Sequence, residues 1–270
     1  MNNWRITEFE EVTSTNTIAK ERLLYGFVRH GDVIQARHQT AGRGRLPGRE
    51  WKDEPGQSLL MSIVLERVPV RSECVQYLAA LAVLSVIREL LVRNAGDASS
   101  VFLKWPNDIL IAGKKACGVL TEAIWQGNTM RAAIVGIGVN VLQRAFFGPL
   151  QHTGISLHLA GIEITVNELR ETILLRLESD LLRYDELGTL EAQGDLIATL
   201  RNELAWMIGT PPLFVTVDGR PVLQEMAFEH IGEDGAMTLR HPDGKVVTLH
   251  SGSIEWEVPV KGIPVTNRMN

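Results

Sequence analysis

The sequence predicts a mixed α/β chain that ends in a small all-β domain, on three observations. Residues 101–140 are the stretch richest in β-forming runs broken by turns. Residues 72–92 are apolar nearly all round, which predicts a central buried helix. Three Asp-Gly hairpin signals, at 218–219, 234–235 and 243–244, predict a barrel or sandwich of about fifty residues. We therefore place a domain boundary near residue 208, between domains of residues 1–207 and 208–270.

The elements before residue 140 follow from local patterns. Residues 4–12 read as a strand, and Ser14-Thr15-Asn16 reads as the start of a helix that continues to Leu24. Residues 40–57 are rich in glycine, proline and basic side chains, which predicts a long loop of the kind that is usually functional or disordered. The remaining predicted strands are Val33–Gln35, Leu59–Leu65, Val101–Leu103, Ile109–Ile111, Gly118–Ile124 and Met130–Val139.

Two helices are predicted between the strand-rich region and the C-terminal domain. Residues 148–161 form a connection, after which Thr165 and Glu168 stand at capping-box spacing. The following helix places one apolar stripe toward the core, made of Leu169, Ile173, Leu177, Leu181 and Tyr184. A second helix, over residues 190–206, ends near Gly209.

Composition excludes several classes of protein. The 270 residues carry a net charge of −5, and 45% are apolar, which excludes intrinsic disorder as the main state and argues against nucleic-acid binding. The longest apolar run, Tyr77–Ile87, is too short for a membrane span. No signal segment is visible at the N-terminus. The two distant cysteines, Cys74 and Cys117, fit a reducing compartment, so we expect a cytoplasmic protein.

The most informative motif is Gln39-Thr40-Ala41-Gly42-Arg43-Gly44-Arg45. Glycines let backbone N–H groups approach a ligand, and arginines supply forked donors for phosphate or carboxylate. The pattern resembles a phosphate cradle, although it is neither a P-loop nor a dinucleotide fingerprint. The alternative is a solvated basic loop. Trp51 follows this motif and could stack on a base.

Other motifs each allow a structural and a functional interpretation. Lys104-Trp105-Pro106-Asn107-Asp108 predicts a strand and turn, in which Asn107 or Asp108 could offer an oxygen to Mg²⁺. In Lys114-Lys115-Ala116-Cys117-Gly118, either lysine could point into a cleft toward an anion. Ser14-Thr15-Asn16 is either a helix cap or a set of ligands for a polar head group.

Glycines also interrupt the last strand of the strand-rich region, in Gly136-Ile137-Gly138-Val139-Asn140. Such glycines weaken a strand unless a backbone or ligand approaches closely, so they predict either a ligand wall or packing against the central helix. The seven histidines have no metal-binding spacing, and no nucleophile elbow is present.

Taken together and in this order, these motifs resemble those of biotin–protein ligases, over residues of about 4–258. The family fold is a mixed α/β catalytic domain around a central mixed sheet, followed by a small SH3-like β-barrel. The resemblance implies that biotin and MgATP form biotinyl-5′-adenylate, and that biotin then passes to a lysine of a biotin carboxyl carrier domain. ATP and biotin are substrates in this reaction, Mg²⁺ is the ion that accompanies ATP, and no permanently bound cofactor is implied.

The resemblance also implies roles for individual residues. Lys115, Arg43 and Arg45 act in catalysis, and Trp51, Asn107 and Asn140 bind the nucleotide. The resemblance assigns neither an Mg²⁺ ligand nor a base for the acceptor lysine, and Asp108 is our candidate for both roles. The implied biotin-binding residues are Ser14, Thr15, Asn16, Gln39, Gly42, Arg43, Gly44, Arg45, Lys115, Gly118 and Gly136.

Two departures from the family pattern matter. Leu46-Pro47-Gly48-Arg49 is one residue longer than usual, which leaves the path to Trp51 undecided. Some relatives carry an N-terminal helix-turn-helix, and the 13 residues before Ser14 are too few for one, so we expect no DNA binding. Members are often homodimers, but the sequence shows no interface. The alternatives are a lipoate–protein ligase and a biotin-binding regulator without transfer activity.

Overall fold

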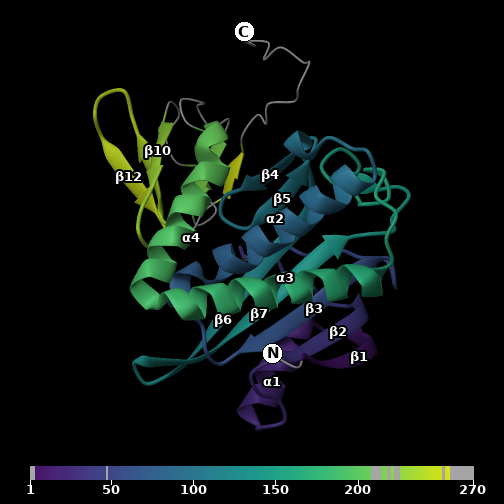
Figure 1. Cartoon of the computed structure of the whole chain (residues 1–270). Helices are drawn as coiled ribbons and strands as arrows, with labels where there is room; N and C mark the ends of the chain where they lie inside the picture. The colour runs from purple at the N-terminus through teal and green to yellow at the C-terminus, as the bar shows by residue number, and fades with distance from the viewer. Residues whose placement is uncertain are drawn as a thin grey trace.

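A seven-stranded mixed sheet forms the centre of the part of the chain that the structure describes (Figure 1). The structure is a computed structural model, which describes residues 4–46, 48–207, 214–217, 220–221, 226–250 and 253–255. The strand order is β1-β2-β3-β7-β6-β5-β4; β1 and β2 run parallel, and the other neighbours are antiparallel. The strands are β1 (Arg5–Val12), β2 (Asp32–Gln39), β3 (Ser58–Leu65), β4 (Val101–Lys104), β5 (Asp108–Ile111), β6 (Lys114–Gln126) and β7 (Thr129–Asn140).

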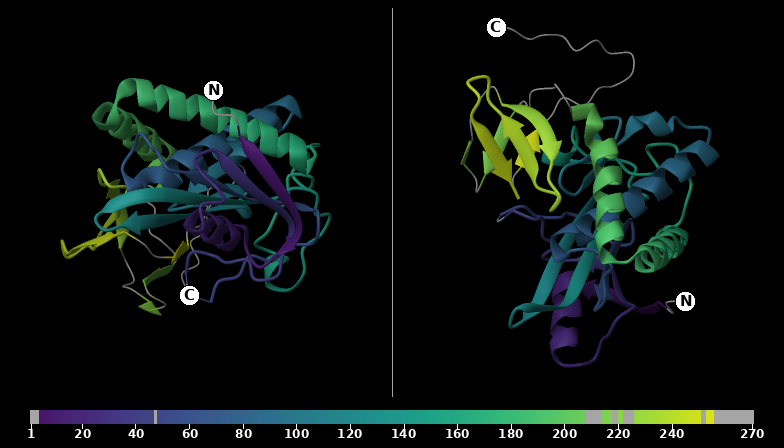
Figure 2. Two further views of the ribbon diagram at one scale, coloured as in Figure 1. Left: turned by 90° about the horizontal axis from the view of Figure 1, so that it is seen from below. Right: turned by 60° about the vertical axis from the view of Figure 1, so that its left-hand side comes forward.

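Helices cover both faces of this sheet. The view from below shows α2 and α3 on one face and α1 on the other (Figure 2, left). The helices are α1 (Thr15–Leu24), α2 (Val75–Arg93), α3 (Val166–Leu187) and α4 (Thr189–Leu204), with short 3-10 turns at Ser72–Cys74, Ala98–Ser100, Gly148–Leu150 and Ala205–Met207. Since both faces are covered, every residue of β3 is buried, which explains its almost unbroken apolar sequence.

The central helix is a core helix, as the sequence predicts. Residues 72–93 are long and apolar enough to cross a membrane by length and composition alone. However, 72% of the most apolar window lies buried inside the protein, against the strands and α3. The apolar composition of this helix is therefore explained by its packing in a large core.

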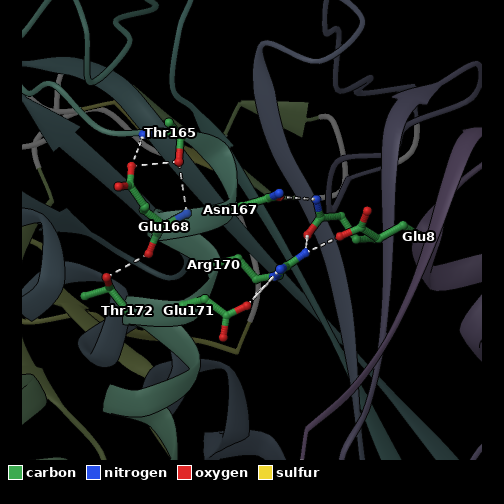
Figure 3. A network of polar contacts seen from close by, with 8 residues as sticks. Glu8, Thr165, Asn167, Glu168, Arg170, Glu171 and Thr172 are labelled. Carbon is green, nitrogen blue, oxygen red and sulfur yellow. Dashed lines mark hydrogen bonds and ion pairs between the residues drawn. The ribbon is translucent and has the colours of Figure 1, made fainter.

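The N-terminus of α3 is fixed to the edge of the sheet by polar contacts (Figure 3). Thr165 and Glu168 form the predicted capping box. One turn later the buried guanidinium of Arg170 donates to Glu8 of β1 and to Gln35 of β2. A buried charge requires such partners, so this network sets where α3 crosses the sheet. The predicted apolar stripe of α3, from Leu169 to Tyr184, is buried throughout.

The C-terminal part forms two small antiparallel sheets, with strand orders β10-β11-β12 and β13-β8-β9. Two predicted hairpin turns are confirmed, at Asp234-Gly235 and Asp243-Gly244, where both glycines have positive φ. The strands are β8 (Phe214–Val217), β9 (Arg220–Pro221), β10 (Ala227–Ile231), β11 (Met237–Arg240), β12 (Val246–Leu249) and β13 (Ser253–Glu255). The third turn at 218–219, Gly209 and the boundary at 208 lie outside the described residues, so the division into domains stays a prediction.

The structure thus confirms the predicted α/β architecture with a small C-terminal β region, and it corrects one strand. We expect a short strand over Val33–Gln35, but β2 continues to Gln39. Its last residues are polar and show no apolar pattern. They stay extended because they pair with β1, where Glu11 lies opposite His38 and Val12 opposite Gln39. The predicted loop over residues 40–57 separates β2 from β3.

Candidate active site

The start of α1 presents three buried polar residues, Ser14, Thr15 and Asn16. Ser14 has the extended backbone of an N-cap residue, but its side chain makes no capping hydrogen bond. Instead, Gln39 Oε1 accepts from Thr15 N at 2.8 Å and lies 3.2 Å from Thr15 Oγ1. The simple cap interpretation therefore does not account for the Ser14 hydroxyl, and Gln39 satisfies the first helical N–H in its place.

Asn16 is held by two residues that the sequence analysis does not single out. Asn16 Nδ2 donates to Glu122 Oε2 at 2.8 Å, while Asn16 Oδ1 lies 2.6 Å from Ser62 Oγ. Ser62 Oγ also lies 2.7 Å from Thr15 Oγ1. Ser62 is the one polar residue inside the apolar stretch Leu59–Leu65, and Glu122 is the one charged residue inside the predicted strand Gly118–Ile124. These polar residues in apolar strands were the available signal for both.

Gly118 of β6 and Gly136 and Gly138 of β7 form a surface without side chains next to Asn16, which we call the glycine floor. A Cβ built on Gly136 would lie 2.4 Å from Asn16 Oδ1. Gly138 lies two residues further along the same strand face, so roughly 7 Å separates the two positions. Gly138 is paired with Gly118 across the two strands. Gly136 and Gly138 lie on the face that carries Asn16 and Trp51, whereas Ile137 and Val139 pack in the core beneath α2, so packing against the central helix does not explain these glycines. Their role as a ligand wall stays a prediction.

Trp51 lies flat on the second half of this floor. A Cβ on Gly138 would lie 3.0 Å from Trp51 Cε2, and one on Gly118 would lie 3.4 Å from Trp51 Cζ3. Trp51 Nε1 is buried and has no hydrogen-bond partner among the residues that the structure describes. Since a buried donor is costly to leave unsatisfied, this indole is suited to a ligand or water that supplies an acceptor. Gly138 is a further residue that the sequence analysis does not assign.

The extra residue of the loop is absorbed by a turn. Gly44 N donates to Arg49 O at 2.7 Å, and Trp51 N donates to Gly42 O at 3.0 Å. These bonds form a short ladder that closes around residues 45–48, of which Pro47 lies outside the described residues. Despite its extra residue, the loop therefore places Trp51 against Gly118 and Gly138. The sequence alone leaves this position of Trp51 undecided.

Lys115 reaches the same floor from β6. Its Nζ lies 2.7 Å from Asp108 Oδ1 and 5.8 Å from the centre of the Trp51 ring. A Cβ on Gly118 would lie 3.2 Å from Lys115 Nζ. Lys114, by contrast, is exposed on the preceding position. Of the two lysines that the motif offers, Lys115 is the one directed to the glycine floor.

The two arginines of the loop take different directions. Arg45 is partly buried, and this burial lowers the pKa of its guanidinium, while Asp108 and Tyr77 act in the opposite direction. Arg45 therefore lies within electrostatic reach of the Lys115–Asp108 pair. Arg43 instead donates to Thr17 Oγ1 at 3.0 Å and lies 3.8 Å from Glu122 Oε2. Arg45 is thus placed with Lys115, whereas Arg43 lies at the α1 end.

Asn107 and Asn140 both support the backbone. Asn107 Nδ2 donates to Val119 O at 2.7 Å, and Asn140 Nδ2 donates to Lys115 O and Ile155 O at 3.3 and 3.2 Å. Both side chains are buried. Their amide donors hold β6 against the turn after β4 and against the connection after β7. A role of either residue at the nucleotide stays a prediction.

A buried acid–base pair fastens the far end of the loop. His38 Nδ1 and Asp53 Oδ2 are 2.9 Å apart, and the Asp53 side chain is fully buried. Burial raises the pKa of Asp53, and the hydrogen bond with His38 opposes this effect. Neither residue is singled out by the sequence, because they are 15 positions apart and match no motif.

Two further features bear on ligands. The described residues contain no group of three or more His, Cys, Asp or Glu that could hold a metal ion. Asp108 is thus a single carboxylate next to Lys115, and Mg²⁺ would enter with the phosphates of a nucleotide. A cavity of about 470 Å³ lies beside the α3 network of Figure 3, lined among others by Glu8, Gln35 and Asn167. None of the predicted site residues lines this cavity.

The chain is similar to known protein ligases. Residues 8–140 match the model of the biotin/lipoate A/B protein ligase family. The bifunctional ligase/repressor BirA of Bacillus subtilis is 31% identical over 252 residues, which cover 92% of this chain and 73% of the relative. The biotin–[acetyl-CoA-carboxylase] ligase of Paracoccus denitrificans is 30% identical over 226 residues, or 79% of this chain and 86% of that protein.

Solved structures show the same fold. The biotin protein ligase from Aquifex aeolicus in complex with biotin and ATP aligns with a TM-score of 0.71, over 94% of this chain and 99% of that one, at 22% identity. The structural match and the two relatives extend well beyond the N-terminal half that the family model covers. The chain belongs to the biotin–protein ligase family.

Proposed function

We propose that this protein is an ATP-dependent biotin–protein ligase. In the first step, a carboxylate oxygen of biotin attacks the α-phosphorus of MgATP, the bond to the pyrophosphate oxygen breaks, and biotinyl-5′-AMP forms. In the second step, the amine of a lysine on a biotin carboxyl carrier domain attacks the acyl carbon. AMP then leaves, and the amine loses a proton. Membership of the family supports this reaction.

One observation carries the proposal: the glycine floor joins a polar end at the start of α1 to a cationic end at Lys115. Asn16, held by Ser62 and Glu122, stands at one end, and Lys115 stands at the other. A molecule with a hydrogen-bonding ring at one end and a carboxylate at the other matches this order. The glycines between the two ends allow the Trp51 ring to pack directly against the strands, where its exposed side can contact a flat ligand.

The polar end suits the ureido ring of biotin. Ser14, Thr15 and Asn16 supply hydroxyl and amide groups that can both donate and accept, and Gln39 fixes the helix start that carries them. All three are buried, so hydrogen bonds to a ligand there would be formed away from bulk water. Gly42 packs on Gln39 Nε2, which keeps the loop close to this end.

The cationic end suits the reacting groups. Joining a carboxylate to a phosphate brings two anions together, and fixed positive charge offsets their repulsion as charge develops on the phosphoryl oxygens. Lys115 and Arg45 supply this charge. Asp108 lies within 2.7 Å of Lys115, where it orients the ammonium and is the nearest carboxylate to accept a proton from the incoming amine. No protein nucleophile is required.

The partner and location follow from the same chemistry. The acceptor is a lysine on a carrier domain of a biotin-dependent carboxylase, presented as a free amine to the adenylate. The two cysteines are buried free thiols, which suits a reducing cytoplasm. Homodimer formation remains part of the proposal and would be measured by the mass of the protein in solution.

The test is an intact-mass measurement of a carrier domain. The protein is incubated with MgATP, the carrier domain and either biotin or lipoate, and omission of the protein is the control. A mass shift with biotin supports the proposal. A shift with lipoate alone would make the protein a lipoate–protein ligase. Tight binding of biotin without adenylate or carrier modification would make it a regulator that lacks transfer activity.

A further inference from the structure

The turn between β10 and β11 enters the catalytic part of the chain. Tyr77 Oη of α2 donates to Gly235 O at 2.8 Å, and Trp105 Nε1 donates to the same oxygen at 3.1 Å. Tyr77 and Trp105 are almost completely buried. One backbone carbonyl of the C-terminal part thus satisfies two buried donors of the catalytic part, 158 and 130 residues away in sequence.

Only glycine fits at this position. Gly235 has φ of +78°, and a Cβ built there would lie 2.1 Å from Tyr77 Cε2. The segment that leads into the turn is also fixed to α4, since Gln193 Nε2 donates to Glu233 O and Arg201 Nε donates to Ile231 O, both at 2.8 Å. The turn is therefore held on its N-terminal side while its tip contacts the aromatic pair.

The two aromatic residues that hold Gly235 adjoin the cationic end of the site. Trp105 begins the turn that ends at Asp108, the partner of Lys115. Tyr77 lies within electrostatic reach of Arg45. The carbonyl of Gly235 thus contacts one residue of the turn that leads to Asp108 and one residue within electrostatic reach of Arg45.

We propose that the Asp234-Gly235 turn is a positioning element for adenylate formation. Gly235 fixes Tyr77 and Trp105, and these residues in turn fix Arg45 and the Lys115–Asp108 pair against the phosphates. Gly235 is a positioning residue, since it acts through its two aromatic partners. This inference rests on the proposed function, and it assigns to the C-terminal part a role in the first half-reaction.

The experiment compares Gly235→Ala with Gly244→Ala. Gly244 has φ of +90° in the next hairpin of the same region, and no atom of the described part of the chain lies within 4 Å of a Cβ built there. Both variants impose the same type of backbone strain, but only Gly235→Ala displaces Tyr77. The readout is biotin-dependent exchange between pyrophosphate and ATP, with KM for ATP and for biotin measured separately.

We expect Gly235→Ala to lower kcat/KM for ATP by roughly tenfold or more, because small displacements of catalytic groups are costly. KM for biotin and the kinetics of Gly244→Ala should stay close to wild type. Simple loss of folded protein would lower kcat without separating the two KM values. Equal kinetics of the two variants, or a proportional loss for both substrates, would overturn the proposal.

Tyr77→Phe provides a second arm that does not depend on how Gly235→Ala folds. It removes the hydroxyl that donates to Gly235 and keeps the buried ring. We expect KM for ATP to rise while KM for biotin does not, and unchanged KM for ATP would count against the proposal. The two failures are distinguishable: wild-type protein that shows no biotin-dependent exchange refutes the proposed function, whereas active wild type with unaffected variants refutes only the role of the turn.

Discussion

Asn16 occupies the space above Gly136 that any side chain at that position would require. A Cβ on Gly136 would lie 2.4 Å from Asn16 Oδ1, closer than van der Waals contact allows. Asn16 is itself held by Glu122 and Ser62, so it has little freedom to move away. The glycine in this strand is therefore a requirement of the polar end of the site.

Gly136→Ala should weaken biotin binding. The added methyl group displaces the Asn16 amide and disturbs two hydrogen bonds, so we expect KM for biotin to rise by roughly tenfold or more. KM for ATP should change less. Gly194→Ala is the control, because it lies in α4 with nothing within 4 Å of a Cβ. Equal biotin KM values in both variants would remove Asn16 from the binding site.

Lys115→Ala should abolish adenylate formation while the chain stays folded. The substitution removes the ammonium beside Asp108, and we expect the rate of pyrophosphate exchange to fall by about a hundredfold or more. The side chain is 39% exposed, so the loss of stability should be at most about 1 kcal/mol. Lys114→Ala is the matched control on the neighbouring exposed position. Wild-type exchange in Lys115→Ala would remove Lys115 from the mechanism.

Arg45→Ala should release biotinyl-5′-AMP faster than wild type does. Arg45 is the loop arginine within electrostatic reach of Asp108, so its loss should weaken the attachment of the loop to the cationic end. Preformed radiolabelled adenylate would be diluted into unlabelled adenylate and its release followed over time. Arg49→Ala, in the exposed part of the same loop, should release at the wild-type rate. Release from Arg45→Ala no faster than wild type would contradict a role in closure.

Asp53 should make stability depend on pH in the mildly acidic range. Burial raises the pKa of Asp53 in the folded state above its ordinary value of 3.8. The folded chain then holds the proton more tightly than the unfolded chain. The resulting contribution of Asp53 to the free energy of unfolding is present below pH 3.8 and is lost as the pH rises through the raised pKa. Asp53→Asn removes the titrating group and should lose less stability than wild type over this range.

The measurement for Asp53 is the free energy of urea unfolding at several values between about pH 4 and pH 7. Glu50→Gln, an exposed residue in the same loop, is the control and should follow wild type. Parallel curves for Asp53→Asn and wild type would show that Asp53 titrates alike in both states. The catalytic assay at the same pH values would report whether the His38–Asp53 pair also affects the loop.

The sequence alone determined most of the secondary structure and the residue types of the site. Periodicity identifies α2 and α3, because a buried helical face repeats its apolar residues at fixed intervals. The capping box at Thr165 and the turns at Gly235 and Gly244 follow from local chemistry within a few residues. The motif residues Asn16, Trp51 and Lys115 are visible for the same reason.

Only the tertiary structure decided which of these residues meet and what holds them. Ser62 and Glu122 stand 46 and 106 positions from Asn16, and the strand register brings them together. The pairing of Gly118 with Gly138 creates the floor for Trp51, and the Gly235 carbonyl reaches Tyr77 across 158 residues. Local patterns encode helices, turns and strands, whereas register and packing arise from contacts between distant segments, which no short stretch of sequence contains.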